Sequence, residues 1–579
     1  MIRILVFAKQ VPDVNKISFD SATGRIIRDN VPLSINSFDK KAVEEGIRIK
    51  EKLGAEVTVA TMGPPQASEI LNESLRMGAD RAFLITDKQF GGADTWVTSK
   101  ILSRLVEMEK PNLVLCGKYS LDGETSQVPP EIAYFSEYSL VTSVSSITFQ
   151  KDQKLTVEQE SELGNTIISI TMPAVISVSE KINKARKIPE GTPDMHEKII
   201  SLDAKAMGID INGQNDSLTI VAGTEKLENK RKTKIISVEE AIKIIEELSK
   251  EGKKSADDIP IVNLDSSHST KIVLGIAIDS SDISGEIASE LANISTVQGF
   301  EVVMAGNISP DKLKGIPCHR YINIKSESND ILSLEISKLI SEIKPEFVIL
   351  PSTVNGREIS ATIAAELGLG LTADCINIKY EEGKLVQFKP AFGGGIIAKI
   401  VSKTKPEMAT VRSGILKRTR SDIPFTVSVI DPLVESRVEI HGFTPLDAEF
   451  RSLSCSNVIF GIGMGARTQE SIKKAKNISY SLGGTVAGTR PVVDMKLLPR
   501  QQQVGLTGAS ISPLLYVAVG ISGNDNHIVG LRYAKTIIAV NKDESAPIFS
   551  YSDYSVIMDS ESFLSTLSDK FVLTDDRIK

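Results

Sequence analysis

An internal repeat is the feature that most restricts how this chain can fold. The first copy contains Pro111-Asn-Leu-Val-Leu-Cys, then Gly123-Glu124, then Pro173-Ala-Val-Ile-Ser-Val. The second contains Pro345-Glu-Phe-Val-Ile-Leu, then Gly356-Arg357, then Pro406-Glu-Met-Ala-Thr-Val. Order and spacing agree at a nearly constant shift, and the match continues through β-rich segments in both copies. Any two α/β domains share part of such a pattern, but its persistence predicts two related domains.

The first ~120 residues alternate short apolar runs with helical patterns. Residues 2–11, 56–62, 81–85 and 113–116 are predicted strands, and residues 38–53 a helix that ends at Gly54. Strands that alternate with helices predict a parallel sheet covered on both faces. The predicted fold class is therefore α/β, with two related doubly wound, nucleotide-binding-like domains.

The remaining sequence divides into a linking segment and a third domain. The linking segment is rich in Lys and Glu and contains one amphipathic helix with Val238, Ile242, Ile245 and Leu248 on one stripe. Residues 458–460, 515–519, 536–540 and 554–558 are the predicted main strands of the third domain. The expected domains are 1–225, a charged tether over 226–265, 266–450 and a compact α/β domain over 451–579.

Composition and charge exclude several classes of function. A net charge of -7 argues against nonspecific binding of nucleic acid. No apolar run is long enough to span a bilayer, and the first residues lack a signal peptide, so we expect a cytoplasmic protein that is not integral to a membrane. The four cysteines form no CxxC pair and the histidines show no metal-ligand spacing, so no metal site is expected. Without a P-loop or a nucleophile elbow, no catalytic residue is assigned, and any redox chemistry needs an organic cofactor.

Three loops of the first domain follow predicted strands or open predicted helices. They are Thr61-Met-Gly-Pro-Pro, Gly91-Gly-Ala-Asp-Thr95 and Asp122-Gly-Glu-Thr-Ser-Gln127. Glycines, hydroxyls and free helical N–H groups can hold a pyrophosphate at the carboxyl ends of parallel strands. Asp122 and Glu124 would repel phosphate, so we expect them to face ribose, backbone or solvent. Each loop alone fits an ordinary turn; together they predict a nucleotide site.

The third domain carries glycine-bearing polar segments after its apolar runs. They are Gly461-Ile-Gly463-Met-Gly465, Gly488-Thr-Arg490-Pro, Val504-Gly-Leu-Thr507-Gly508, Gly520-Ile-Ser522-Gly-Asn-Asp-Asn526-His527 and Asn541-Lys-Asp. A cavity with a cation, an imidazole and amides suits an isoalloxazine ring, since Arg or His near its N1–C2=O edge would raise the reduction potential. There are alternatives for two of these features. The first segment also fits a tight turn, and His527 also fits a buried histidine with a structural role.

These segments resemble a known family. Gly488-Thr-Arg490-Pro-Val-Val-Asp494, Val-Ala-Val-Gly520-Ile-Ser-Gly with His527, and Asn541-Lys-Asp-Glu-Ser-Ala-Pro are similar to the FAD domain of the electron-transfer flavoprotein α subunit. Residues 1 to about 225 resemble the β subunit. The resemblance implies fused β-like and α-like parts, with FAD on a C-terminal Rossmann-like domain. It also implies a second nucleotide, FAD or AMP, in the N-terminal domain. The first-domain motifs are nearest the bifurcating branch, in which the second nucleotide is FAD.

The resemblance also implies which residues bind each cofactor. For the C-terminal FAD they are Thr489, Arg490, Val504, Gly505, Thr507, Gly508, Ser522, Gly523, Asn526, His527, Asn541 and Asp559. For the second FAD or AMP they are Ala8, Asn36, Asp39, Met62, Gly63, Thr95, Gly117, Asp122, Gly123, Thr125, Gln127 and Val128.

The function implied is electron transfer rather than a stand-alone enzyme activity. The expected partners are flavin dehydrogenases, such as the acyl-CoA dehydrogenases of fatty acid β-oxidation, and a quinone oxidoreductase or ferredoxin. One alternative is an NADH-oxidising, electron-bifurcating flavoprotein with a catalytic second FAD. Another is a non-redox protein that binds adenine nucleotides. The reduction potentials and true bifurcation stay open, because residues such as Met464, Leu506 and Ala509 depart from the family pattern near the flavin. Donor and acceptor stay open because residues 183–195, which match the family's dehydrogenase-recognition loop, are divergent. The oligomeric state also stays open.

Overall fold

The computed structural model describes residues 1–12, 18–19, 26–27, 31–226, 231–252, 259–264, 271–392, 395–445, 453 and 456–571. The chain forms two compact units. The first unit comprises residues 1–226, 262–412 and 420–444, and the second comprises 227–261, 413–419 and 445–579. Within the first unit, residues 1–226 are called the first copy, and residues 262–412 with 420–444 the second copy. None of the helices in the described part is both long and apolar enough to cross a membrane.

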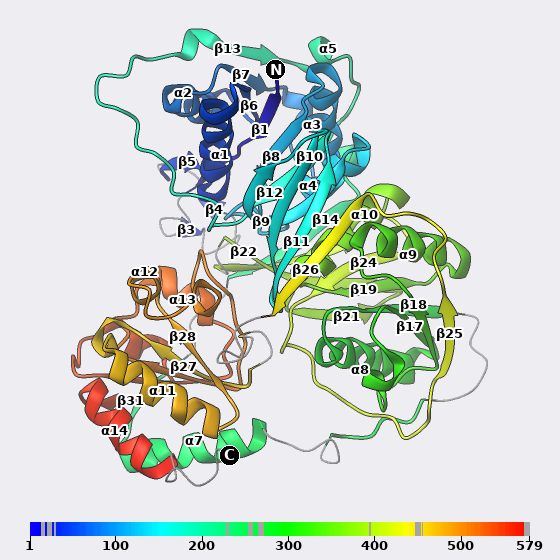
Figure 1. The fold of residues 1–579 in the computed structure, drawn as a ribbon. Helices are drawn as coiled ribbons and strands as arrows, with labels where there is room; N and C mark the ends of the chain where they lie inside the picture. Colours follow the sequence, from blue (N-terminus) through cyan, green and yellow to red (C-terminus); the bar gives the residue numbers. More distant parts are fainter. Residues whose placement is uncertain are drawn as a thin grey trace. The chain divides into compact units, whose positions relative to one another are not determined.

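The first copy is built on a sheet whose strand order is β13-β7-β6-β1-β8-β12-β9-β10-β11-β26 (Figure 1). The strands from β13 to β9 run parallel, and β10 and β11 are antiparallel additions. They are β1 (Arg3–Phe7), β6 (Glu56–Met62), β7 (Arg81–Ile85), β8 (Leu113–Gly117), β9 (Ser139–Phe149), β10 (Lys154–Glu160), β11 (Gly164–Thr171), β12 (Ala174–Val178) and β13 (Ile199–Leu202).

Helices cover both faces of this sheet. The apolar side chains of β1 alternate between two cores, with Ile4 and Val6 in one and Leu5 and Phe7 in the other. The first core includes α1 (Ser37–Leu53) and α2 (Ser68–Met77), and the second includes α3 (Thr95–Glu109) and α4 (Val128–Phe135). This alternation is the signature of a parallel sheet buried on both sides. The predicted α/β class with parallel sheets is confirmed.

The strand predicted over residues 2–11 is interrupted. The structure has β1 over Arg3–Phe7 and a separate β2 over Gln10–Pro12, which pairs with β5 (Leu33–Ile35). Between them, the Lys9 N–H donates to the Asp39 carboxylate at 2.8 Å instead of to a neighbouring strand. The apolar run therefore continues in sequence while the backbone leaves the sheet. The predicted helix 38–53 corresponds to α1, which ends at Gly54 with φ of 68°.

The second copy repeats the strand order of the first. Its sheet runs β25-β18-β17-β16-β19-β24-β20, which matches β13-β7-β6-β1-β8-β12-β9 position by position. The strands are β16 (Ile272–Ala277), β17 (Glu301–Gly306), β18 (Arg320–Ile324), β19 (Phe347–Pro351), β20 (Leu371–Cys375), β24 (Glu407–Val411) and β25 (Thr426–Ile430). Its helices are α8 (Ser281–Gln298), α9 (Asn329–Ile343) and α10 (Val354–Leu367). Identical topology is what the internal repeat in the sequence predicts.

The two copies exchange strands. In the first copy, β14 (Thr219–Lys226) leaves its own sheet and pairs with β23 (Ile396–Ser402), beside β22 (Lys384–Ala391) and β21 (Asn377–Glu381). In return β26 (Val438–Pro445) lies beside β11 at the edge of the first copy's sheet (Figure 1). Each copy therefore completes a sheet of the other, which explains why the two form one compact unit.

The second unit contains a parallel sheet with the order β15-β31-β30-β29-β27-β28. Its strands are β15 (Lys234–Ile235), β27 (Val458–Ile462), β28 (Thr485–Gly488), β29 (Leu515–Val519), β30 (Thr536–Asn541) and β31 (Tyr554–Ile557). Its helices are α7 (Val238–Gly252), α11 (Gln469–Ser481), α12 (Arg490–Asp494), α13 (Asp525–Leu531) and α14 (Ser560–Phe571). The predicted strands of the third domain fall within one to two residues of β27, β29, β30 and β31. In chain order from β27 the sheet reads 2-1-3-4-5, a doubly wound arrangement with its switch point between β27 and β29.

Part of the expected tether belongs to this sheet. β15 adds an edge strand beside β31, and α7 places Ala241 and Ile245 in the core of the second unit. Arg231, just before β15, forms an ion pair with Asp553. Residues 231–252 thus contribute a strand and a helix to the second unit.

Candidate functional site

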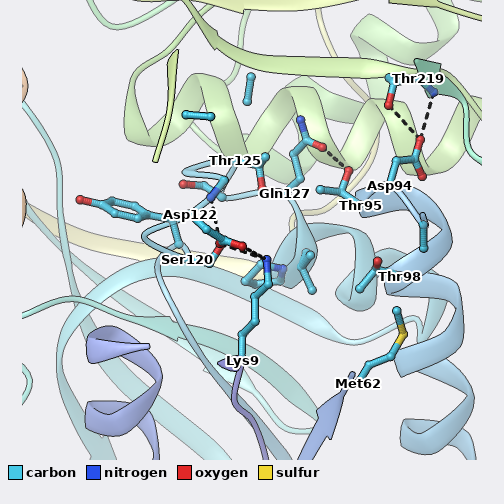
Figure 2. A pocket seen from close by; sticks show the side chains of 18 of the residues that line it. Lys9, Met62, Asp94, Thr95, Thr98, Ser120, Asp122, Thr125, Gln127 and Thr219 are labelled. Carbon is cyan, nitrogen blue, oxygen red and sulfur yellow. Dashed lines mark hydrogen bonds and ion pairs between the residues drawn. The ribbon is translucent and has the colours of Figure 1, made fainter. Parts of the chain in front are cut away.

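A cavity of about 940 Å³ lies in the first unit, at the carboxyl ends of β1, β6 and β8. Figure 2 shows part of its polar lining. Carboxyl ends of parallel strands are where open α/β sheets bind their ligands. Most of the residues predicted for the second nucleotide line this cavity: Ala8, Asp39, Met62, Thr95, Gly117, Asp122, Gly123, Thr125, Gln127 and Val128. That they bind a nucleotide stays a prediction.

Two predicted residues, Asn36 and Gly63, do not line the cavity but support its walls. The Asn36 amide donates to the Tyr119 carbonyl at 2.9 Å and accepts from the Leu121 N–H at 3.2 Å. Gly63 donates from its N–H to the Ile85 carbonyl at 3.0 Å, which fixes the turn after β6. Asn36 therefore sets the course of the loop that follows β8.

Asp39 joins the ends of β1 and β8. Its carboxylate accepts from the Lys9 N–H at 2.8 Å and from the Gly117 N–H at 3.0 Å. Burial raises the pKa of Asp39 to about 7, although both N–H groups favour the ionised form. A Cβ at position 117 would stand 2.3 Å from the Asp39 carboxylate, so only glycine fits there.

The loop over residues 118–127 carries a charge pair at the cavity. Lys9 contacts Asp122 at 2.8 Å, and Asp122 also accepts from the Gly123 N–H at 2.9 Å (Figure 2). Burial by itself would raise the pKa of Asp122, but the Lys9 charge and the hydrogen bonds outweigh it and lower the pKa. The carboxylate is thus neutralised by a lysine and the backbone. Because Lys9 is half exposed, the pair contributes little to stability and serves mainly to orient the loop.

The second copy completes this loop. The Phe392 N–H donates to the Asp122 carbonyl at 2.9 Å, and the Gln127 amide donates to the Leu371 carbonyl at 3.1 Å. Arg357 of α10 donates to the Ser126 hydroxyl at 3.3 Å. Gln127 in turn accepts from the Thr95 hydroxyl at the start of α3 (Figure 2). The loop identified from the sequence therefore depends on residues more than two hundred positions away.

The exchanged strand β14 is fastened to the same region by Asp94. This residue caps α3 by accepting from the Val97 N–H at 3.1 Å. Its other oxygen accepts from the Leu218 N–H at 2.7 Å. The same oxygen accepts from the Thr219 N–H and hydroxyl, both at 3.1 Å (Figure 2). One carboxylate thus fixes both the helix start and the strand that forms a cavity wall.

Sequence reasoning missed the cavity walls contributed by the second copy and by β14. They are Leu371, Thr372, Ala373, Lys389, Ala391, Phe392, Ile396, Ala398 and Ile400, with Thr219, Val221 and Thr224. Apart from Phe392, which follows β22, these residues lie on the strands β14, β20, β22 and β23. The sequence did not assign them to a site, because tertiary pairing, such as that of β14 with β23, brings these strands to the cavity.

The cavity lining fits a nucleotide. Thr61 and Thr372, which are 1% and 2% exposed, both line the cavity. Within the described residues, their hydroxyls have no hydrogen-bond partner. A buried hydroxyl normally has a partner, so both are suited to a polar ligand. The side chains of Val221, Phe392 and Ile396 form an apolar part of the lining that suits a flat ring.

A buried charge cluster lies behind this wall. Asp374 contacts Arg412 and, at 3.0 Å, Arg357. Burial would raise the pKa of Asp374, but the two guanidinium charges lower it well below its usual value. Burial, together with the charge of Asp374, raises the pKa of nearby Glu124, which does not line the cavity. Lys389 adds a further cation to this cluster, and the charges of Asp374 and Glu124 act on it.

In the second unit, the predicted FAD residues lie on loops at the carboxyl ends of the strands. Gln503 forms an isolated parallel β-bridge with Gly488, and the Val504 N–H donates to the Gly488 carbonyl at 3.1 Å. The Leu506 N–H donates to the Asn526 carbonyl at 2.7 Å. The structure therefore brings together the segments that carry Thr489, residues 504–508, and Asn526 with His527.

His527 is buried, and both of its ring nitrogens contact protein. Nδ1 is 3.0 Å from the Val504 carbonyl, which can only accept, so Nδ1 carries the hydrogen. Nε2, 3.0 Å from the Tyr516 hydroxyl, then accepts. Burial lowers the pKa of His527 to about 4, so the ring is neutral at pH 7. These contacts are compatible with the buried structural histidine that the sequence left as an alternative, and the expected role of His527 beside the flavin stays a prediction.

The other predicted FAD residues hold their loops in distinct ways. Asn541 donates to the Ile521 carbonyl at 3.0 Å, and the Ser522 carbonyl accepts from the Ile548 N–H at 3.1 Å. Asp559 caps α14 through the N–H groups of Glu561 and Ser562, both at 3.0 Å.

The remaining predicted positions frame the loops after β28 and β29. Thr507 accepts from the Gln503 amide at 3.0 Å. A Cβ at Gly505, Gly508 or Gly523 would lie 2.2 to 2.5 Å from backbone atoms. Arg490 opens α12 with its side chain 56% exposed, 3.5 Å from Asp494.

The glycine loop after β27 is a close-packed turn. A Cβ at Gly463 would stand 2.2 Å from the Gly520 carbonyl oxygen, and the Gly465 N–H donates to that oxygen at 2.9 Å. The glycines let two loops touch at the switch point. Nearby, within the described part of the chain, the buried Thr489 hydroxyl has no hydrogen-bond partner. These loops fit an FAD whose polar groups Thr489 would contact.

Comparison with known proteins gives two family matches. The description "Electron transfer flavoprotein domain" matches residues 23–206 and 330–428, and "Electron transfer flavoprotein FAD-binding domain" matches residues 452–532. The first match falls on both copies of the first unit, and the second on the sheet of the second unit.

Curated relatives are similar to different parts of the chain. An electron transfer flavoprotein subunit beta from Thermoanaerobacterium thermosaccharolyticum is 45% identical over 32% of this chain and 70% of its own length. The caffeyl-CoA reductase-Etf complex subunit CarD from Acetobacterium woodii is 43% identical over 34% of this chain and 77% of its own. An electron transfer flavoprotein subunit alpha from Clostridium acetobutylicum is 34% identical over 44% of this chain and 82% of its own.

Both kinds of subunit are thus represented in one polypeptide, and the FAD-binding domain supports FAD as a cofactor. The chain belongs to the electron-transfer flavoprotein family, with β-like and α-like parts fused.

Proposed function

We propose that this chain carries electrons through two flavins, one FAD on residues 451–579 and a second FAD in the cavity of the first unit. The proposed donors are flavoproteins of the acyl-CoA dehydrogenase type, and the proposed acceptor is a quinone oxidoreductase or ferredoxin. Flavin would supply the redox chemistry.

The size of the cavity is the observation that most supports a second FAD. A volume of about 940 Å³ is near the upper end of ligand pockets, ~300–1,000 Å³. An adenine mononucleotide would leave much of it empty. The first copy contributes Phe7, Ala60 and Leu102 to the apolar lining, and the second copy contributes Phe392 and Ile396. Apolar lining from both copies, together with the polar loop 118–127, suits a ligand with two ring systems joined by a pyrophosphate.

The chain's own residues position and shield this nucleotide. N–H groups of loop 118–127 and the Thr125 hydroxyl would hold phosphate, while Lys9 keeps Asp122 from repelling it. The Thr61 hydroxyl would take a polar atom of the nucleotide end. β14 and β23 would exclude water from the ring end.

In the second unit, Thr489, Thr507, Ser522 and Asn541 would bind polar parts of FAD, and Arg490 would place positive charge near the ring. A cation near the flavin favours its reduced, more negative form and raises the reduction potential.

Counting the nucleotides released from purified full-length protein tests this proposal. We expect two FAD per chain, identified by chromatography after denaturation. One FAD with one AMP would restrict the chain to a single flavin. Protein that releases adenine nucleotides but no flavin would contradict the proposed carrier function and favour the non-redox alternative.

A second candidate is an NADH-oxidising, electron-bifurcating flavoprotein. The relative CarD, whose name places it in a caffeyl-CoA reductase-Etf complex, favours it together with the size of the cavity. Anaerobic mixing with NADH separates the candidates. Rapid bleaching of flavin absorbance supports NADH oxidation at the second FAD, whereas unchanged absorbance supports a shuttle reduced by partner flavoproteins.

A further inference from the structure

Lys389 is a buried charge on the cavity wall formed by the second copy. It lies on β22, is 5% exposed and lines the cavity. Its ammonium group donates to the Ala373 carbonyl at 2.9 Å. An ammonium has three hydrogens to donate, and a buried one is costly unless they are used.

In the part of the chain that the structure describes, the surroundings of Lys389 give its ammonium group fewer acceptors than it has hydrogens to donate. Among the described residues, the Ala373 carbonyl is the acceptor that the structure gives Lys389. The neighbouring carboxylate of Asp374 is already engaged by Arg412 and Arg357. Burial lowers the pKa of Lys389, while the charges of Asp374 and Glu124 oppose that shift.

A second polar group lies on the same wall. Thr372 is 2% exposed, lines the cavity, and its hydroxyl has no partner within the described chain. Around these two groups the wall is apolar, with Leu371, Ala391 and Phe392. An ammonium and a hydroxyl set in an apolar wall match a flat heteroaromatic ring with carbonyl and ring-nitrogen acceptors along one edge.

We infer that Lys389 and Thr372 form the subsite for the ring end of the second nucleotide, with Lys389 donating to the acceptor edge of a flavin. The inference rests on the proposed second FAD, and it names the residues that would select FAD over adenine nucleotides. An adenine mononucleotide held at loop 118–127 leaves this subsite unused, so Lys389 discriminates FAD from AMP and ADP. Its positive charge also favours the ring when the ring carries extra electrons.

Binding of FAD and ADP to full-length protein tests the subsite, because ADP shares only the nucleotide end. Removal of a hydrogen bond from a charged donor costs about ten- to a hundredfold in affinity. We expect Lys389→Met to weaken FAD binding at the first-unit site by at least about tenfold and to change ADP binding less than about twofold. Lys389→Arg should recover part of the loss. Lys384→Met, on an exposed residue of the same strand, is the control.

Thr372→Val, which keeps the shape of the side chain, provides a second variant if Lys389→Met does not fold. It should weaken FAD binding severalfold and leave ADP binding unchanged. A variant that keeps the FAD of the second unit and an unchanged unfolding midpoint is correctly folded.

The outcomes separate the two proposals. Unmodified protein that binds two FAD, together with variants that bind FAD as tightly as it does, would overturn the subsite and leave the carrier function standing. Equal loss of FAD and ADP would also overturn the subsite, because it indicates a general structural defect. Unmodified protein that accepts AMP or ADP but no second FAD would overturn both the subsite and the two-flavin proposal.

Discussion

The side-chain amide of Gln127 donates to the Leu371 carbonyl at 3.1 Å, a contact that spans 244 positions of the chain. Gln127 follows the loop at the cavity in the first copy, and Leu371 begins β20 of the second copy. The same amide accepts from the Thr95 hydroxyl. A single buried residue thus connects α3, the cavity loop and the second copy.

Replacement of Gln127 by Ala should weaken nucleotide binding in the first unit. The change leaves the Leu371 carbonyl and the Thr95 hydroxyl without Gln127, at a cost of about 1–3 kcal/mol. We expect about tenfold weaker binding and a lower unfolding midpoint, measured by nucleotide titration and thermal unfolding. Gln150→Ala, at an exposed site, is the control. Unaltered binding would show that this contact does not hold the loop.

Replacement of Gly117 by Ala should damage the junction of β1 and β8. The added Cβ would lie 2.3 Å from Asp39 and 2.7 Å from the Phe38 Cβ, both buried. Overpacking of this kind costs about 1–3 kcal/mol. Denaturant unfolding should show that loss, together with reduced nucleotide content. Gly442→Ala, where a Cβ would have nothing within 4 Å, should be neutral; equal effects of both changes would contradict the steric explanation.

The second unit should lose stability as the pH falls from about 6.5 to about 4. The pKa of His527 is about 4 in the folded protein, and its ordinary value of 6.5 applies to the unfolded chain. The unfolded chain therefore binds more protons than the folded protein in this pH interval. The free energy of unfolding therefore rises with pH, by about 3 kcal/mol across the interval for this residue alone.

His527→Gln tests this pH dependence, because glutamine does not titrate. Unfolding of the second unit can be monitored between pH 4.5 and 8 by the release of its FAD. The free energy of unfolding should depend less on pH in the variant than in the unmodified protein. An identical dependence in both proteins would remove His527 as its origin.

Arg490→Ala should lower the reduction potential of the FAD in the second unit. Loss of a positive charge near the ring makes the reduced form less favourable. Spectroelectrochemical titration measures the potential, and Lys473→Ala, which removes an exposed charge from α11, controls for net charge. An unchanged potential in Arg490→Ala would exclude Arg490 from the flavin environment.

Much of the fold could be predicted from local sequence. Apolar runs such as 56–62 and 81–85 coincide with β6 and β7, since buried parallel strands are short and continuous in their apolar pattern. The internal repeat predicted two related domains, and the two sheets share one strand order. The cavity loop at Asp122 and Gln127 was identified because glycine and hydroxyl residues after a strand carry a local signal.

Tertiary structure decided the rest. The apolar run 2–11 does not reveal that Asp39 draws the Lys9 backbone out of the sheet. Nothing in the sequence of β22 or β14 shows that Lys389 and Thr219 meet at one cavity, because an exchanged strand has the same alternating pattern as any other. Local pattern determines which segments become strands and helices; which segments pair, and so which side chains share a site, depends on contacts between residues hundreds of positions apart.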